Sequence, residues 1–128
     1  MGTGLDSELG LVELGRRGLA RDSLERLAGF LDISMHRISG LLPVTWRTVQ
    51  RHPPGKRFGQ AVSEHILQMA VVAAMGHRVF GEREKFLKWM DLPSSALAGA
   101  SPVSLLDSRF GMGMVLDELA RIMHGTPS

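Results

Sequence analysis

Apolar residues recur at helical spacing along most of the 128-residue chain, and no stretch alternates as a strand would. The spacing predicts an all-α protein. One expected stripe is formed by Leu24, Leu27, Ala28 and Leu31, and a longer one is formed by Val62, Ile66, Met69, Ala70, Ala73 and Val79. Helices are expected over residues 7–17, 35–42, 45–52, 59–80, 82–90 and 113–124, with a further short helix that begins at Ser101-Pro102.

Helix-ending and helix-starting residues stand between these stripes. Gly18 should end the first helix, and Asp22 with Glu25 has the form of a capping box. Ser34 can cap the helix over 35–42, and Pro43 should end it.

The strongest break is Pro53-Pro54-Gly55, which predicts a domain boundary after residue 58. Residues 1–58 would form the first domain, which holds the helix-turn-helix layout described below. Residues 59–128 would then hold a long connecting helix and a small helical domain. Within that second part, Gly111 and Gly113 are expected to separate the short helix from the last one, and Gly125 is expected to end the last one.

Composition narrows the class of protein. The chain has no cysteine, so neither a disulfide framework nor a zinc–thiolate site is possible, which fits a reducing cytoplasm. Its N-terminus lacks the basic and apolar regions of a secretory signal. The most apolar stretch, Ile66 to Gly76, contains Gln68 and is too short to cross a bilayer. We therefore expect a cytoplasmic protein with no membrane partner.

Charge is unevenly placed. Residues 1–60 carry nine Lys/Arg against six Asp/Glu, a net charge of +3, and residues 61–128 carry six against seven, a net charge of −1. No acid occurs between Asp32 and Glu64, while that stretch holds Arg37, Arg47, Arg51, Lys56 and Arg57. Such a basic patch is typical of phosphate contact, although a solvated face has the same composition.

No catalytic or metal-binding constellation is apparent. The five histidines, at positions 36, 52, 65, 77 and 124, never stand at the His-x-x-x-His spacing, and no phosphate loop, dinucleotide fingerprint or nucleophile elbow is present. We therefore expect a protein that is not an enzyme and that holds neither a cofactor nor a metal.

Residues 24–52 have the layout of a helix-turn-helix, with 35–42 as the supporting helix and 45–52 as the recognition helix. Arg residues on such a helix can contact guanine, and Thr suits phosphates or a thymine methyl. On periodicity alone, a plain helical hairpin with a solvated basic helix is favoured. The residues expected to contact DNA are Thr45, Arg47, Thr48, Gln50 and Arg51.

Two features of the C-terminal half have both a structural and a functional interpretation. Trp89, beside Phe86, is expected mainly to pack in the core, although tryptophan is also enriched at binding hot spots. In the turn Leu97-Ala98-Gly99-Ala100-Ser101-Pro102, Gly99 is expected to carry any demand for a positive φ, and Ala98 would be strained there. We expect most methionines to fill the core, and an adaptable contact surface is the alternative for Met112, Met114 and Met123.

The order and spacing of these segments resemble the Xre/MbcA/ParS type of antitoxin. Trp89-Met90 stands where this family has Trp-Leu, and residues 97–102 match its Leu-Gly-Gly-x-x-Pro turn with Ala98 in place of a glycine. The segment Thr45 to Arg51 is similar to the recognition segment of the Xre-like domain, with Trp46 as a departure.

The resemblance implies an antitoxin that binds and blocks a RES-domain toxin, which consumes NAD or transfers ADP-ribose, and that represses its own operon through operator DNA. The expected toxin-facing surface combines residues 97–102 with the last helix. Its members are Leu97, Gly99, Pro102, Arg109, Asp117, Glu118 and Arg121, the four charged ones as a polar rim. A homodimer is expected, because paired helix-turn-helix units read paired half-sites.

Two other functions stay open. The chain is also compatible with a stand-alone helix-turn-helix regulator whose C-terminal half only dimerises. A third possibility is an adaptor module in which the DNA-binding half no longer binds DNA.

Overall fold

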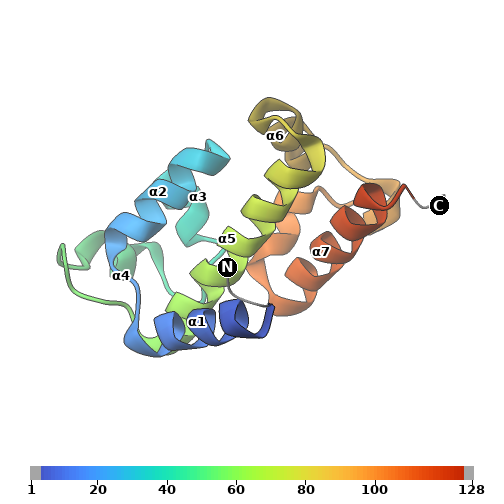
Figure 1. Ribbon diagram of the computed structural model, residues 1–128. Coiled ribbons are helices and arrows are strands. Elements are labelled where there is room, and N and C mark those ends of the chain that lie inside the picture. Colours follow the sequence, from blue (N-terminus) through green and yellow to red (C-terminus); the bar gives the residue numbers. More distant parts are fainter. Residues whose placement is uncertain (1–3, 126–128) are drawn as a thin grey trace. The chain divides into compact units, whose positions relative to one another are not determined.

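The computed structural model describes residues 4–125, and their secondary structure is helical apart from a single isolated antiparallel bridge between Ala20 and Arg57 (Figure 1). The prediction of an all-α fold is confirmed. The elements are α1 (Gly4–Arg17), α2 (Arg21–Leu31), α3 (Met35–Ser39), α4 (Trp46–Arg51), α5 (Gln60–Phe80), α6 (Arg83–Asp91), η1 (Ser95–Leu97), η2 (Pro102–Asp107) and α7 (Arg109–Met123).

The chain divides into two compact units, residues 1–68 and 69–128. Helix α5 begins in unit 1 and ends in unit 2. The division therefore falls inside α5, ten residues after the predicted division between 58 and 59. Because no partner or fragment defines a functional boundary, the assignment of residues 59–68 to the C-terminal domain stays a prediction.

The core of unit 1 is built from the apolar stripes that the sequence shows. Its buried members are Leu24, Leu27, Ala28, Leu31, Ile38, Leu42, Val49, Phe58, Val62 and Ile66. The α1–α2 connection packs against the segment that precedes α5 and against the first turn of α5. The N–H of Phe58 donates to the carbonyl of Leu19 (2.8 Å), and the N–H of Leu19 donates to Ser63 Oγ in α5 (2.9 Å). Gly18 permits this approach, because a Cβ there would lie 2.5 Å from the carbonyl oxygen of Phe58.

Three local expectations in unit 1 are wrong. Helix α1 begins at Gly4 rather than near residue 7. Helix α2 has Ala20 at its N-cap with no side-chain cap, and Asp22 lies in the first turn, where it pairs with Arg26 at 3.0 Å instead of forming a capping box. Helix α3 ends at Ser39, and the chain continues to Leu42 through i→i+3 hydrogen bonds, so the helix ends before Pro43 can act. The cap by Ser34 is confirmed, since its Oγ accepts from the N–H of Arg37 at 3.0 Å.

Unit 2 packs α6, η1, η2 and α7 with the C-terminal part of α5. Its buried apolar side chains are Met69, Val72, Ala73, Phe86, Met90, Leu97, Val103, Leu106, Met112, Val115 and Leu119. Trp89 is half-buried and packs against Phe80 and Phe86, with ring centroids 5.4 and 6.5 Å apart. This agrees with a mainly structural role for Trp89. On α5, Ala70 is exposed and Val72 is buried, so the predicted stripe is wrong at Ala70.

The last helix also differs from its prediction. Helix α7 begins at Arg109, capped by Ser108 Oγ, which accepts from the N–H of Gly111 at 2.9 Å. Gly111 and Gly113 therefore lie inside the helix and separate nothing. Ser101 precedes η2 without a side-chain cap, and its carbonyl instead accepts from Ser104 Oγ at 2.7 Å. Gly125 has the positive φ (64°) expected after a helix C-terminus.

Candidate functional site

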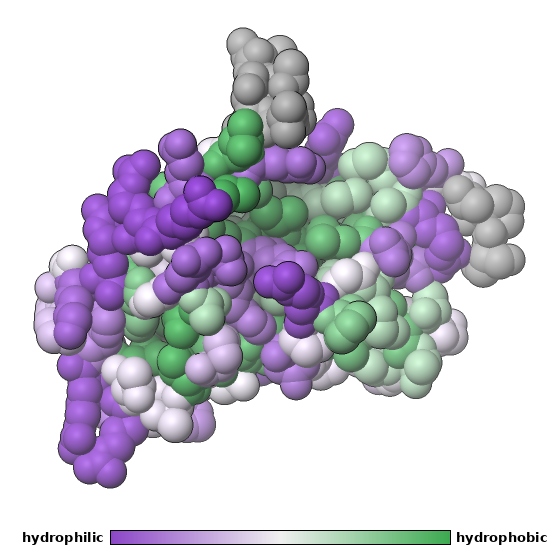
Figure 2. All heavy atoms as spheres, turned by 90° about the horizontal axis from the view of Figure 1, so that it is seen from below, coloured by the Kyte–Doolittle hydropathy of each residue, from purple (hydrophilic) through white to green (hydrophobic). Residues whose placement is uncertain are grey.

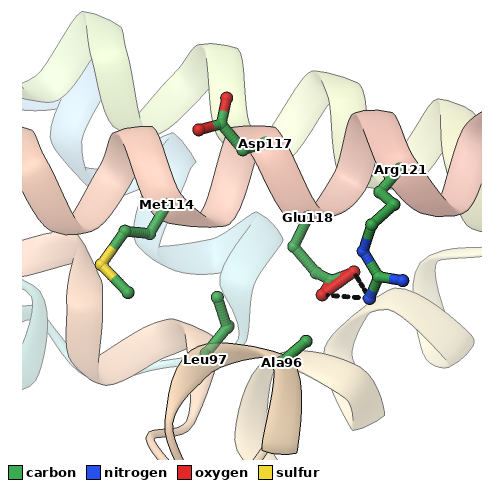
Figure 3. A pocket seen from close by; sticks show the side chains of 6 residues that line it. All are labelled: Ala96, Leu97, Met114, Asp117, Glu118 and Arg121. Carbon is green, nitrogen blue, oxygen red and sulfur yellow. Dashed lines mark hydrogen bonds and ion pairs between the residues drawn. The ribbon is translucent and has the colours of Figure 1, made fainter. Parts of the chain in front are cut away.

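The surface of unit 2 is hollowed between η1 and α7. The hollow has a volume of about 250 Å³ and is lined by Ala96, Leu97, Met114, Asp117, Glu118 and Arg121. Figure 3 shows Met114, Glu118 and Arg121 reaching from α7 toward η1, while Asp117 points away from that loop. The site therefore combines an apolar end, formed by Met114 and Leu97, with a charged end.

The charged end is organised by an ion pair on consecutive turns of α7. Glu118 is only 5% exposed, and both of its carboxylate oxygens accept from one Nη atom of Arg121, Oε2 at 2.6 Å (Figure 3). The side chain of Arg121 is one-third exposed. The pair neutralises the Glu118 charge, so the carboxylate of Asp117 is left as the net charge of the hollow. Glu118 is thus not the exposed rim residue that we expected, and its part in toxin binding stays a prediction.

The predicted toxin-facing residues are only partly brought together. Leu97, Asp117, Glu118 and Arg121 line the hollow, and Leu97 is itself buried. The other three, Gly99, Pro102 and Arg109, do not line it. Of these, Pro102 is buried, whereas Gly99 and Arg109 are exposed.

The turn after η1 has two consecutive residues with positive φ, Ala98 at 59° and Gly99 at 85°. The expectation that Gly99 alone carries this demand is therefore wrong. The N–H of Gly99 donates to the carbonyl of Ser94 (2.8 Å), and the N–H of Ser94 donates to the carbonyl of Ala100 (3.0 Å), which closes the turn. Ala98 is the strained position in it, because a Cβ disfavours the left-handed region.

Two residues on α7 were not among the predicted site residues. Phe110 is 90% exposed, and Met114, one turn later, is 43% exposed. Met114 was considered for a contact surface together with Met112 and Met123. Met112 does not belong to such a surface, because it is buried in the core.

A second candidate surface is helix α4 in unit 1. Val49 is fully buried, while Arg47 and Arg51 are exposed. At 100° per residue these two arginines lie on the side of the helix opposite Val49, where they face solvent together. Figure 2 shows hydrophilic side chains gathered over unit 1, on the left of that view.

The other predicted DNA-contacting residues have different surroundings. Thr45 is the N-cap of α4: its Oγ1 accepts from the N–H of Thr48 at 3.1 Å and lies 3.0 Å from the Thr48 hydroxyl. Gln50 is exposed. Thr45 and Thr48 are thus already engaged in capping the start of α4.

Sequence reasoning missed Arg21, which holds the other end of α4. One Nη atom of Arg21 donates to the carbonyls of Val49 and Gln50, each at 3.2 Å. A cation at a helix C-terminus satisfies free carbonyls and interacts favourably with the helix dipole. No sequence signal links residues 28 positions apart.

Among the side chains that the structure describes, those of residues 7–125, no group of three or more His, Cys, Asp or Glu has the arrangement of a metal site. None of the described helices is long and apolar enough to cross a membrane.

Known proteins resemble this chain in two ways, one in the sequence of its C-terminal part and one in its fold. Residues 75–125 match the family model described as the antitoxin Xre/MbcA/ParS C-terminal toxin-binding domain. Among solved structures, one chain of the crystal structure of the M. tuberculosis MbcT–MbcA toxin–antitoxin complex is similar, with a TM-score of 0.63 and 17% identity over 84% of this chain and 96% of that chain. At this identity the likeness shows the fold alone. No curated protein is significantly similar in sequence.

Proposed function

We propose that this chain, whose residues 75–125 belong to the Xre/MbcA/ParS family of antitoxin toxin-binding domains, is the antitoxin of a type II toxin–antitoxin pair. The observation that carries the proposal is where the family match falls. It spans the end of α5 together with α6, η1, η2 and α7, which are the elements that form and support the hollow of unit 2. The hollow and the outer side of α7 would be the toxin-binding surface.

The toxin would be a RES-domain protein that consumes NAD or transfers ADP-ribose. This finer assignment is supported by the resemblance of the turn at residues 97–102 and of Trp89-Met90 to the family pattern. In this proposal the chain acts by covering the toxin and contributes no chemistry of its own, so the NAD belongs to the partner. Affinity would come from apolar burial, and register would come from complementary charge.

Unit 1 would bind the operator of the same operon. The exposed Arg47 and Arg51 on one side of α4 support this, because arginine can pair with the edge of guanine in the major groove. Thr48 and Gln50 are exposed beside them. A homodimer would place two such helices on paired half-sites.

The first experiment is co-expression of the chain with the RES-domain protein encoded beside it, followed by size-exclusion chromatography and an NAD-consumption assay. A stable complex with suppressed NAD loss would support the antitoxin function. A neighbour that neither binds the chain nor consumes NAD would overturn it. That result would favour the alternative function, a stand-alone regulator whose C-terminal half only dimerises.

DNA binding is tested separately, on the DNA upstream of the gene, at several salt concentrations. Arg47→Ala or Arg51→Ala should weaken binding by about 5- to 150-fold, as expected for the loss of one base contact. Lys88→Ala is a matched control, since Lys88 is an exposed cation of unit 2. Equal affinity of all three variants and the wild type would show that α4 is not the recognition helix.

A further inference from the structure

The most exposed large apolar side chain in the described part of the molecule is Phe110, in the first turn of α7. Only a tenth of its surface is covered. A phenylalanine left in water contributes almost nothing to folding, because its free energy of burial is not gained. Helix capping does not need it either, since Ser108 supplies the cap.

Phe110 begins a continuous row along the outer side of α7. Met114, Asp117 and Arg121 follow it at intervals of four, three and four residues, so all four lie on one face of the helix. The opposite face of α7, which carries Val115 and Leu119, is buried in the core of unit 2. Three members of the row, Met114, Asp117 and Arg121, also line the hollow beside η1 (Figure 3).

Charges of opposite sign lie at the two ends of the apolar part of this row. Arg109 and Asp117 are both exposed, and neither forms an ion pair with another described residue. A cation at the first residue of a helix opposes the helix dipole, so Arg109 does not stabilise α7 by its position. From the start of the helix onward, the surface therefore presents a positive charge, two apolar side chains and a negative charge.

We propose that Phe110 is the anchor by which α7 holds the toxin, with Met114 as its neighbour in the contact. This rests on the proposed antitoxin function and adds the residue that carries the affinity. The toxin surface complementary to it is an apolar pocket that takes the aromatic ring. An acidic group faces Arg109 and a basic group faces Asp117. Aromatic anchors seated in pockets carry most of the energy of such interfaces.

The test measures the affinity of purified chain variants for an inactive form of the RES-domain protein encoded beside it. Burial of one phenylalanine predicts that Phe110→Ala weakens binding by about 10- to 150-fold, with Met114→Ala weaker in effect. Leu92→Ala is the matched control, because Leu92 is also an exposed apolar residue of unit 2 (61%) but lies outside the row. The control should bind as the wild type does. Since Phe110 is exposed, its variant should keep the wild-type circular dichroism spectrum and melting temperature.

The charge direction is tested with Asp117→Lys and Arg109→Glu. Each should slow association, and the effect should shrink as salt is raised, because exposed charges act mainly on the association rate. Association rates that match the wild type at low salt would overturn the charged part of the proposal.

The outcomes separate the anchor from the function. If the wild-type chain fails to bind the toxin, the proposed function fails and the anchor fails with it. If the wild type binds and Phe110→Ala binds equally tightly, the anchor alone is overturned. If Phe110→Ala abolishes self-association in sedimentation experiments and leaves toxin affinity unchanged, the row contacts a second copy of the chain and the proposal is likewise wrong.

Discussion

Replacing Gly111 with alanine should destabilise the protein, although the residue lies in a helix where alanine is normally the better choice. An ideal Cβ at Gly111 would lie 2.0 Å from the carbonyl oxygen of Leu105 and 2.9 Å from its carbonyl carbon. Both atoms belong to the backbone of η2, so no side-chain rotation can remove the overlap. Helix α7 and η2 would have to separate by about an ångström to restore ordinary contact.

The size of the effect follows from two opposing terms. Alanine gains up to about 1 kcal/mol over glycine in helix propensity, and less in a first turn. Forcing an extra methyl group into a packed contact costs about 1–3 kcal/mol, and a rigid backbone neighbour places this case at the upper end. We therefore expect Gly111→Ala to lower the free energy of unfolding by about 1–2 kcal/mol.

Gly113→Ala is the matched control. It lies two residues later in the same helix, and a Cβ there would meet nothing within 4 Å. This variant should be more stable than the wild type by about 0.4–1 kcal/mol, because alanine narrows the unfolded ensemble. Urea denaturation followed by circular dichroism measures both. A Gly111→Ala variant at least as stable as the wild type, or a Gly113→Ala variant that loses stability, would refute the packing argument.

Two further substitutions test the neighbourhood of the hollow. Ala98→Gly should raise the free energy of unfolding by about 0.5–1 kcal/mol, because glycine takes the positive φ of 59° without the strain of a Cβ; the same denaturation experiment checks it, and a loss of stability would contradict the strain. Arg121→Ala should lower the free energy of unfolding by about 1–3 kcal/mol, because the nearly buried Glu118 carboxylate loses its ion-pair partner. Adding Glu118→Gln should recover part of that loss, and a double-mutant cycle with no coupling would contradict the pairing.

Much of the fold follows from the sequence because helix periodicity is a local property. All four members of the stripe from Leu24 to Leu31 are buried, and the long helix expected over residues 59–80 spans Gln60–Phe80. An amphipathic helix shows its apolar face in the sequence, whichever element packs against that face. The break at Pro53-Pro54-Gly55 also depends only on local backbone conformation, and Gly55 does take a positive φ of 81°.

Errors arose where packing between neighbouring elements, or the choice between two partners of one side chain, decides the local structure. Gly111 and Gly113, two positions apart, look like a helix break in the sequence. In the structure the backbone of η2 passes against Gly111 and leaves no room for a Cβ there. The sequence also does not show whether a polar side chain caps a helix or binds another partner. Ser108 rather than Gly113 marks the start of α7, and Asp22 forms an ion pair instead of a cap.

The misplaced start of α7 also explains why Phe110 escaped notice. A residue outside a predicted helix has no assigned phase, so its direction cannot be deduced from the stripe that follows. Once Ser108 is the cap, Phe110 falls in the first turn, on the side opposite Val115 and Leu119, and its exposure follows from helix geometry. Trp89 shows the converse, because the side chain that best fits a hot spot by residue type packs against Phe80 and Phe86. Residue type alone thus favours Trp89 as the anchor, whereas the helix start and the packed core favour Phe110.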